Sequence, residues 1–213
     1  MAEPEAPAGP SGIAGIADPA PLGLAAFALT TFLLSADNAA IIKGSGNAWL
    51  GYALAYGGLI QLLAGMWEFR RGNVFGATAF SSYGGFWIGL WFYFLHNGPN
   101  TKDLGFILLA FAIFNTYMLL CSTRVNAAVM GVFLTLELTE IFLFIGFLAD
   151  NTNIIKIGGW IGIVTAVVAW YTSFAGVFNS FGGDRGLPVG RPLMNAGALS
   201  GVPRQAERVG VPD

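Results

Sequence analysis

Two glutamates, Glu137 and Glu140, lie inside the otherwise apolar stretch 127–149. A carboxylate near the centre of a bilayer costs on the order of 3 kcal/mol, so we expect both side chains to face a cavity, a partner or the interior of a helix bundle. Residues three or four apart share a helix face, which places Glu140 one turn beyond Leu136 and beside Glu137. The two glutamates are therefore a candidate proton relay, and an interhelical ion pair or hydrogen bond without a transport role explains them equally well.

Neutral polar side chains also occur within apolar stretches. Thr31, Ser35 and Asn38 are spaced to share one face of a helix. In a membrane such groups either bind a substrate or, somewhat more commonly, hydrogen-bond to neighbouring helices. The candidates to hydrogen-bond a polar solute along a substrate path are Thr31, Ser35, Asn38, Gln61, Ser82 and Asn115.

Other kinds of site have little support. The sequence contains no phosphate-binding loop, nucleophile elbow or metal-binding helix motif. Cys121 is the only cysteine and His96 the only histidine, and a metal site needs several such ligands. The ten Lys and Arg residues are dispersed, unlike a nucleic-acid-binding surface. We expect no enzyme activity, no cofactor or metal, and no nucleic-acid partner.

The elements that carry these residues are predicted from hydropathy. Of the 213 residues, 55% are hydrophobic and 10% are charged, whereas a soluble domain has about a quarter charged. A spanning helix needs about 20 mainly apolar residues. We therefore predict an all-α membrane protein with six transmembrane helices at 19–36, 49–67, 75–95, 104–121, 127–149 and 157–178.

These helices form one predicted domain, residues 18–180. It lies between a disordered N-terminal tail (1–17) and a flexible C-terminal tail (181–213), both predicted to be cytoplasmic. Basic residues near span ends favour this orientation, because Lys and Arg near span ends are enriched on the cytoplasmic side. Glu68, Arg70 and Arg71 form the predicted polar turn between the second and third helices. A solvated or ion-paired turn is the usual interpretation, and a mouth that attracts anions is the alternative.

Three segments carry a resemblance to a known family. Residues 18–27 read DPAPLGLAAF and resemble the NPAPLGL signature of the acetate uptake transporter family, which includes the bacterial succinate-acetate permeases. Residues 57–83 (GGLIQLLAGMWEFRRGNVFGATAFSSY) and 158–163 (GGWIGI) are similar to two further blocks of that family. Together the similarity extends over roughly residues 18–180.

The resemblance implies a six-helix protomer in a ring-shaped homo-oligomer, commonly a hexamer, with both termini cytoplasmic and a substrate path through each protomer. It also implies an apolar pore constriction formed by a Phe, a Tyr and a Leu. These match Phe27, Tyr83 and, by counting back from Ile145-Gly146, Leu136, with Leu134 as the competing register. The chain departs from the family pattern at Asp18, where the signature has Asn, and at the two glutamates of the fifth helix.

The function predicted from this resemblance is transport of acetate and similar short monocarboxylates, with succinate as a further candidate, across the cytoplasmic membrane. A channel and a proton-coupled transporter both fit. The expected partners are a small carboxylate, the lipid bilayer and further copies of the chain. The alternatives are a urea- or amide-type channel for neutral solutes, and a membrane sensor or scaffold that transports nothing.

Overall fold

The computed structural model describes residues 15–42, 48–96, 98, 100–182 and 185–194, and these contain helices and no strand. The helices are α1 (Ala20–Asn38), α2 (Ala48–Tyr52), η1 (Ala53–Ile60), α3 (Gln61–Arg71), α4 (Val74–His96), α5 (Thr101–Ser122), α6 (Ala127–Leu148) and α7 (Thr152–Ser180). Because α2, η1 and α3 follow one another without a break, they form one helical rod, Ala48–Arg71. The described chain thus has six long rods, which confirms the predicted all-α fold with six helices.

The rods have the length and composition of membrane spans. Five of them are long and apolar enough to cross a bilayer: α1, the Ala48–Arg71 rod, α5, α6 and α7. The sixth, α4, has 23 residues and no Asp, Glu, Lys or Arg, but its Gly, Ser, Trp and Tyr residues lower its hydropathy. Its length still exceeds the roughly 20 residues that a bilayer requires.

Asparagine side chains set the start of three helices. Asn100 accepts hydrogen bonds from the backbone N–H groups of the first turn of α5, Asn126 does so for α6, and Asn151 for α7. Such caps satisfy donors that have no partner within the helix. At the other end of the second rod, Gly72 has a φ of 75°, which ends α3 and starts the turn into α4.

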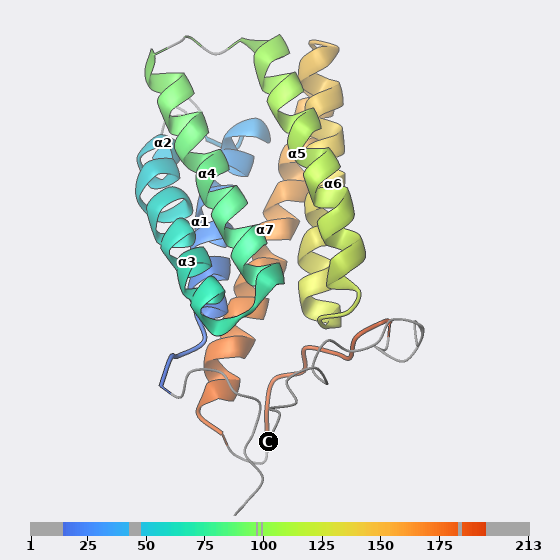
Figure 1. Cartoon of the computed structure of the whole chain (residues 1–213). Coiled ribbons are helices and arrows are strands. Elements are labelled where there is room, and N and C mark those ends of the chain that lie inside the picture. The colour runs from blue at the N-terminus through green and yellow to red at the C-terminus, as the bar shows by residue number, and fades with distance from the viewer. Residues whose placement is uncertain (1–14, 43–47, 97, 99, 183–184, 195–213) are drawn as a thin grey trace, which may run out of the picture.

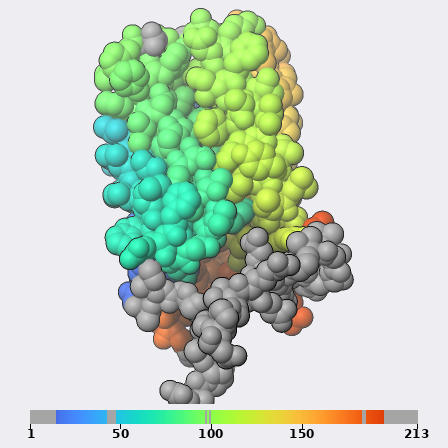
Figure 2. All heavy atoms as spheres, viewed as in Figure 1, coloured from blue at the N-terminus to red at the C-terminus, as the bar shows by residue number. Residues whose placement is uncertain are grey.

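The helix α1 is central. It packs against α7 on one side and against the rod of η1 and α3 on the other, while α4 lies against that rod and α6 lies between α5 and α7 (Figure 1). Figure 2 shows the face of the bundle that α4 and α5 share, and residues of both helices line a groove between them. One end of the bundle, which we call the arginine end, carries Arg70, Arg71, Arg124, Arg185 and Arg191.

A π-helical segment, η1, brings the second rod against α1. A Cβ added at Gly57 would lie 2.6 Å from Oγ1 of Thr30, so only glycine permits this approach. Thr30 Oγ1 is 3.1 Å from the Ala26 carbonyl oxygen and 3.5 Å from that of Tyr52, at the start of the π segment. Short π segments often occur at functional sites. After this segment, the buried face of α3 carries Gln61, Ala64, Gly65 and Glu68.

Residues 185–194 run back across the arginine end as an extended strap (Figure 1). The Ala128 N–H donates to the Val189 carbonyl at 2.9 Å, and the Leu193 N–H donates to the Thr123 carbonyl at 2.8 Å. The Tyr171 hydroxyl on α7 donates to the Pro188 carbonyl at 2.6 Å. This part of the predicted C-terminal tail is thus tied to α7 and to the turn between α5 and α6. Residues 195–213 and 1–14 of the two predicted tails lie outside the described residues.

Candidate functional site

Three cavities follow one another through the bundle. The arginine-end cavity has a volume of about 90 Å³, the middle cavity about 40 Å³ and the far cavity about 300 Å³. The first two are both lined by Phe27, Tyr83 and Leu136, which we call the collar. The middle and far cavities in turn share Leu34, Asn38, Phe86, Leu108 and Leu143. The shared linings make a continuous row from the arginine end to the opposite end.

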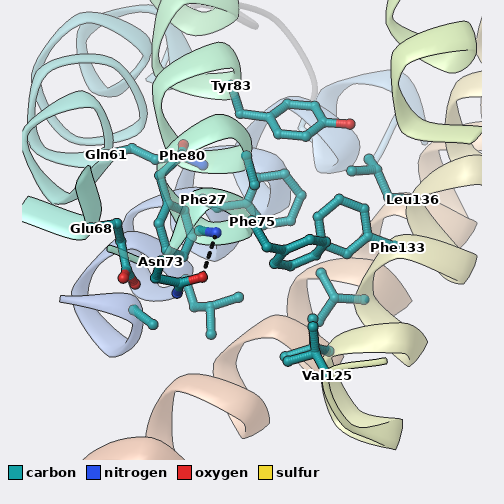
Figure 3. A pocket seen from close by; sticks show the side chains of 16 residues that line it. Phe27, Gln61, Glu68, Asn73, Phe75, Phe80, Tyr83, Val125, Phe133 and Leu136 are labelled. Atoms are coloured by element: carbon teal, nitrogen blue, oxygen red, sulfur yellow. Dashed lines mark hydrogen bonds between the residues drawn. The ribbon is translucent and has the colours of Figure 1, made fainter. Parts of the chain in front are cut away.

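The collar brings together the three residues that were matched to an apolar constriction. The rings of Phe27 and Tyr83 meet edge to face, with centroids 5.8 Å apart. All three side chains are buried, and Figure 3 shows Tyr83 and Leu136 beside the arginine-end cavity. Leu134, the competing register, has 46% of its surface exposed and lines none of the three cavities. The residue that lies in the row is therefore Leu136.

The Tyr83 hydroxyl connects the collar to a buried polar network. It lies 2.9 Å from Oδ1 of Asn115 and 3.4 Å from Oε1 of Glu140. Asn115 donates through Nδ2 to the Phe133 carbonyl at 2.9 Å and to Oε2 of Glu137 at 2.6 Å. Since Nδ2 faces two acceptors, Oδ1 is the atom turned toward Tyr83, as expected for an acceptor of the phenol proton.

The two glutamates of α6 have different environments. Glu137 is half-buried on the side of α5, where its two carboxylate oxygens accept hydrogen bonds from Asn115 and from the Thr116 hydroxyl, the latter at 2.8 Å. Glu140 is buried and lines the middle cavity, and its Oε2 has no hydrogen-bond partner in the described chain. Only Glu140 of this pair therefore faces the row of cavities.

The predicted polar residues divide into two groups. Thr31, Ser35 and Asn38 line the middle cavity, and Gln61 lines the arginine-end cavity. Asn115 lies behind the collar, lines none of the three cavities, and contacts the lining residues Tyr83 and Phe133. Ser82 is not brought to the row at all.

Ser82 lines a separate groove between α4 and α5, together with Gly85 and Gly89. Adjacent residues on a helix point about 100° apart, and Tyr83 takes the inward direction on this turn of α4. The groove has a volume of about 570 Å³. The sequence prediction grouped Ser82 with the path because it considered residue type without this rotation.

Two carboxyl side chains in the row were not predicted. Glu68, which sequence analysis placed in a solvated or ion-paired turn, does form a long ion pair with Arg71, but it is fully buried and lines the arginine-end cavity. Its spacing of seven residues from Gln61 was the available signal, since residues i and i+7 share a helix face. Asp37 lines the far cavity. Each cavity thus has one carboxyl side chain, and no Lys, Arg or His lines any of the three among the described residues.

Asp18, the departure from the family signature, forms an ion pair at the arginine end. Its Oδ1 lies 2.5 Å from Nη1 of Arg71. The same Arg71 atom is 3.8 Å from Oε2 of Glu68. The negative charge that replaces an amide at this mouth is therefore balanced by a neighbouring cation. No group of three His, Cys, Asp or Glu side chains in the described chain could hold a metal ion.

Known proteins resemble this chain over most of its length. Acetate permease A of Emericella nidulans is 42% identical over 186 residues, which are 77% of this chain and 62% of that protein. The succinate-acetate/proton symporter SatP of Escherichia coli K12 is 36% identical over 181 residues, 82% of this chain and 96% of SatP. The solved structure of the bacterial acetate channel SatP superimposes with a TM-score of 0.77 at 36% identity and covers 82% of this chain and 99% of that one.

The chain spans between 60 and 64% of the length of four fungal relatives that it matches, and nearly all of SatP. The sequence profile of the GPR1/FUN34/yaaH family matches residues 3–183, which include every described helix. The chain therefore belongs to the GPR1/FUN34/yaaH family.

Proposed function

We propose that this chain carries acetate and similar short monocarboxylates across a membrane through the row of three cavities. The observation that carries the proposal is that two cavities meet at the collar, which leaves only Phe27, Tyr83 and Leu136 between them. The acetate permease and SatP relatives support a carboxylate as the substrate. An apolar collar excludes water and hydrated ions, which suits a small acid able to shed its water or to carry a proton.

A liposome assay separates this proposal from its alternatives. The purified full chain is reconstituted, and the entry of labelled acetate and of labelled urea is measured with and without excess unlabelled acetate. We expect acetate entry above that of empty liposomes, lowered by competing acetate, and no added urea entry. Urea entry without acetate entry would support a neutral-solute channel. Entry of neither would favour a sensor or scaffold.

Proton coupling through Glu140 is the second part of the proposal. A phenol has one proton to give, and the shorter contact of Tyr83 is to Asn115, at 2.9 Å against 3.4 Å to Glu140. When the Tyr83 hydroxyl donates this proton to Asn115, it can only accept a hydrogen bond from Glu140. Glu140 must then carry a proton of its own. Tyr83 also belongs to the collar, so a change in the protonation of Glu140 acts directly on the constriction.

The charges along the row support the same idea. A path for bare anions is commonly lined by Lys or Arg, whereas the three cavities contain only carboxyl side chains among their charged groups. A carboxylate passing a second carboxylate in a low-dielectric space is strongly repelled. A proton that accompanies the substrate removes this repulsion, and Glu140 is the candidate to hold it at the collar.

We also propose that the arginine end faces the cytoplasm, in the cytoplasmic membrane, with both termini on that side. The five arginines of that end, against Lys102 and Lys156 at the opposite end, match the usual enrichment of cytoplasmic loops in basic residues. The assembly proposed is a ring of copies, commonly six in the family. The groove of α4 and α5 supports an intermolecular contact there, because a Cβ at Gly85 or Gly89 would meet no atom within 4 Å, and small residues favour helix contacts in membranes.

A further inference from the structure

The arginine-end cavity contains a fully buried carboxyl group. Glu68 has none of its surface exposed, and it lines the cavity together with Gln61 and Asn73. Figure 3 shows these three side chains on one side of the cavity, with Phe133 and Leu136 on the other. A single water needs about 10–15 Å³ of such space, so a cavity of about 90 Å³ has room for a small acid.

The backbone of α4 is shaped around this carboxyl group. A Cβ added at Gly76 would lie 2.9 Å from Oε1 of Glu68 and 2.7 Å from Nδ2 of Asn73. A side chain at position 76 would therefore displace the ends of both side chains. Asn73 in turn is held by the Gly76 N–H, which donates to its Oδ1 at 3.2 Å. Glu68 is thus seated in a fixed place between α3 and the start of α4.

Glu68 and Gln61 keep free hydrogen-bonding capacity, although the Asn73 amide lies beside the Glu68 carboxylate. Within the described chain, neither carboxylate oxygen of Glu68 has a hydrogen-bond partner, and neither does Oε1 of Gln61. Buried polar atoms are almost always hydrogen-bonded, so a group of free ones needs an explanation. These free atoms belong to two side chains that line one cavity, which is the arrangement expected where a polar ligand binds.

The cation closest to Glu68 is engaged elsewhere. Nη1 of Arg71 lies 3.8 Å from Oε2 of Glu68, beyond hydrogen-bond distance, and the same atom contacts Asp18 at 2.5 Å. Asp18, in front of α1, and Arg71, on α3, are the charged groups that face Glu68. The cavity residues from α4 and α6 are uncharged, and Glu140 lies beyond the collar.

We propose that the arginine-end cavity binds the carboxyl group of a small carboxylic acid, with Glu68 and the substrate sharing one proton and the Gln61 amide N–H donating to the other substrate oxygen. This inference rests on the proposed transport function. Two ionised carboxylates in one site repel each other, and one proton between them replaces the repulsion by a strong O–H···O⁻ hydrogen bond. The substrate is then held, together with a proton, on the arginine-end side of the collar, while Glu140 lies on the other side.

The test is the pH dependence of acetate binding to the purified full chain in lipid nanodiscs, measured between pH 6 and 8. Uptake of one proton with each acetate makes the dissociation constant fall about ten-fold for each unit by which the pH is lowered. Glu68→Gln cannot share a proton in this way, so we expect its dissociation constant to change less than two-fold across the range. Asp150→Asn, which removes an exposed carboxyl group in the turn after α6, is the matched control and keeps the wild-type slope.

A second variant tests the inference if Glu68→Gln does not fold. Asp18→Asn alters a half-exposed side chain and releases Arg71, which can then pair with Glu68 and keep it ionised, so the slope falls well below ten-fold per pH unit. A wild-type slope in either folded variant would overturn the shared-proton site while leaving transport intact. If the wild-type chain neither binds nor carries acetate, the proposed function fails, and this inference fails with it.

Discussion

In the proposed path, the collar residues set the size of the acid that can pass. Phe27 and Leu136 come from α1 and α6 and line both cavities that meet there, so shortening both side chains joins the cavities. We predict that the double variant Phe27→Ala, Leu136→Ala carries succinate into liposomes several-fold faster than the wild type. Leu134→Ala, which alters an exposed leucine on the same helix, is the control. Unchanged succinate entry in the double variant would contradict the collar assignment.

The two glutamates of α6 should differ when they are neutralised. Glu140 lines the middle cavity with one oxygen free, whereas both oxygens of Glu137 accept hydrogen bonds from α5. We predict that Glu140→Gln flattens the dependence of acetate flux on pH, while Glu137→Gln keeps its shape and lowers stability by about 1–3 kcal/mol through its lost hydrogen bonds. The measurement is initial acetate flux from pH 5 to 8. The same profile in Glu140→Gln as in the wild type would remove Glu140 from the proton path.

Residue types alone could not supply the site. Phe27, Tyr83 and Leu136 are ordinary packing residues by type, and only the resemblance singled them out before the structure placed them at two cavities. Glu68 was missed because its burial depends on Gly76, eight positions later on another helix. Ser82 was included because a hydroxyl was expected in the path, although the rotation of α4 that points Tyr83 inward turns its neighbour toward the outer groove.

At the scale of helices, the contact between α1 and η1 fixes the position of the second rod. A side chain at Gly57 would collide with Thr30, at 2.6 Å from its Oγ1, and overpacking of this kind costs about 1–3 kcal/mol. We predict that Gly57→Val lowers the thermal midpoint of the detergent-solubilised protein by several degrees. Gly51→Ala, on the same rod with no atom within 4 Å of the added carbon, should leave the midpoint unchanged. An equal midpoint for both variants would show that the close approach at η1 does not matter for stability.

The strap of residues 185–194 holds the turn between α5 and α6 against α7. One anchor is the hydrogen bond from Tyr171 to the Pro188 carbonyl, and such a bond contributes about 1 kcal/mol. We predict that Tyr171→Phe increases amide hydrogen exchange by about five-fold at Leu187 and Leu193, whose N–H groups are hydrogen-bonded, with no change in the middle of α5. If exchange in the strap is unchanged, this bond is not an anchor.

Helix positions were well predicted because long uncharged stretches leave few alternatives in a membrane protein. The predicted spans 75–95 and 104–121 lie within α4 and α5. The last span, predicted at 157–178, is the longer helix Thr152–Ser180 in the structure. The prediction began after Lys156 because Lys156 and the polar Asn cap lower the hydropathy of the first turn. The π segment of Ala53–Ile60 was not predicted, because hydropathy does not distinguish a π turn from an α turn.

At the scale of the whole molecule, the three cavities form one row within a single protomer. Their shared linings join the arginine end to the opposite end within a single chain, so the proposed ring of copies is not required to form the pore. In the proposed ring, the contacts between copies lie along the groove of α4 and α5. The carboxyl groups Glu68, Glu140 and Asp37, one in each cavity, give the path a row of protonatable groups.

The most direct test is the entry of labelled acetate into liposomes that contain the purified full chain, with and without an inward proton gradient. Empty liposomes are the reference, because acetic acid crosses bilayers on its own. The account predicts entry several-fold above the empty liposomes in both conditions, and faster entry when the gradient is applied. Acetate entry equal to that of empty liposomes under both conditions would contradict the proposed path.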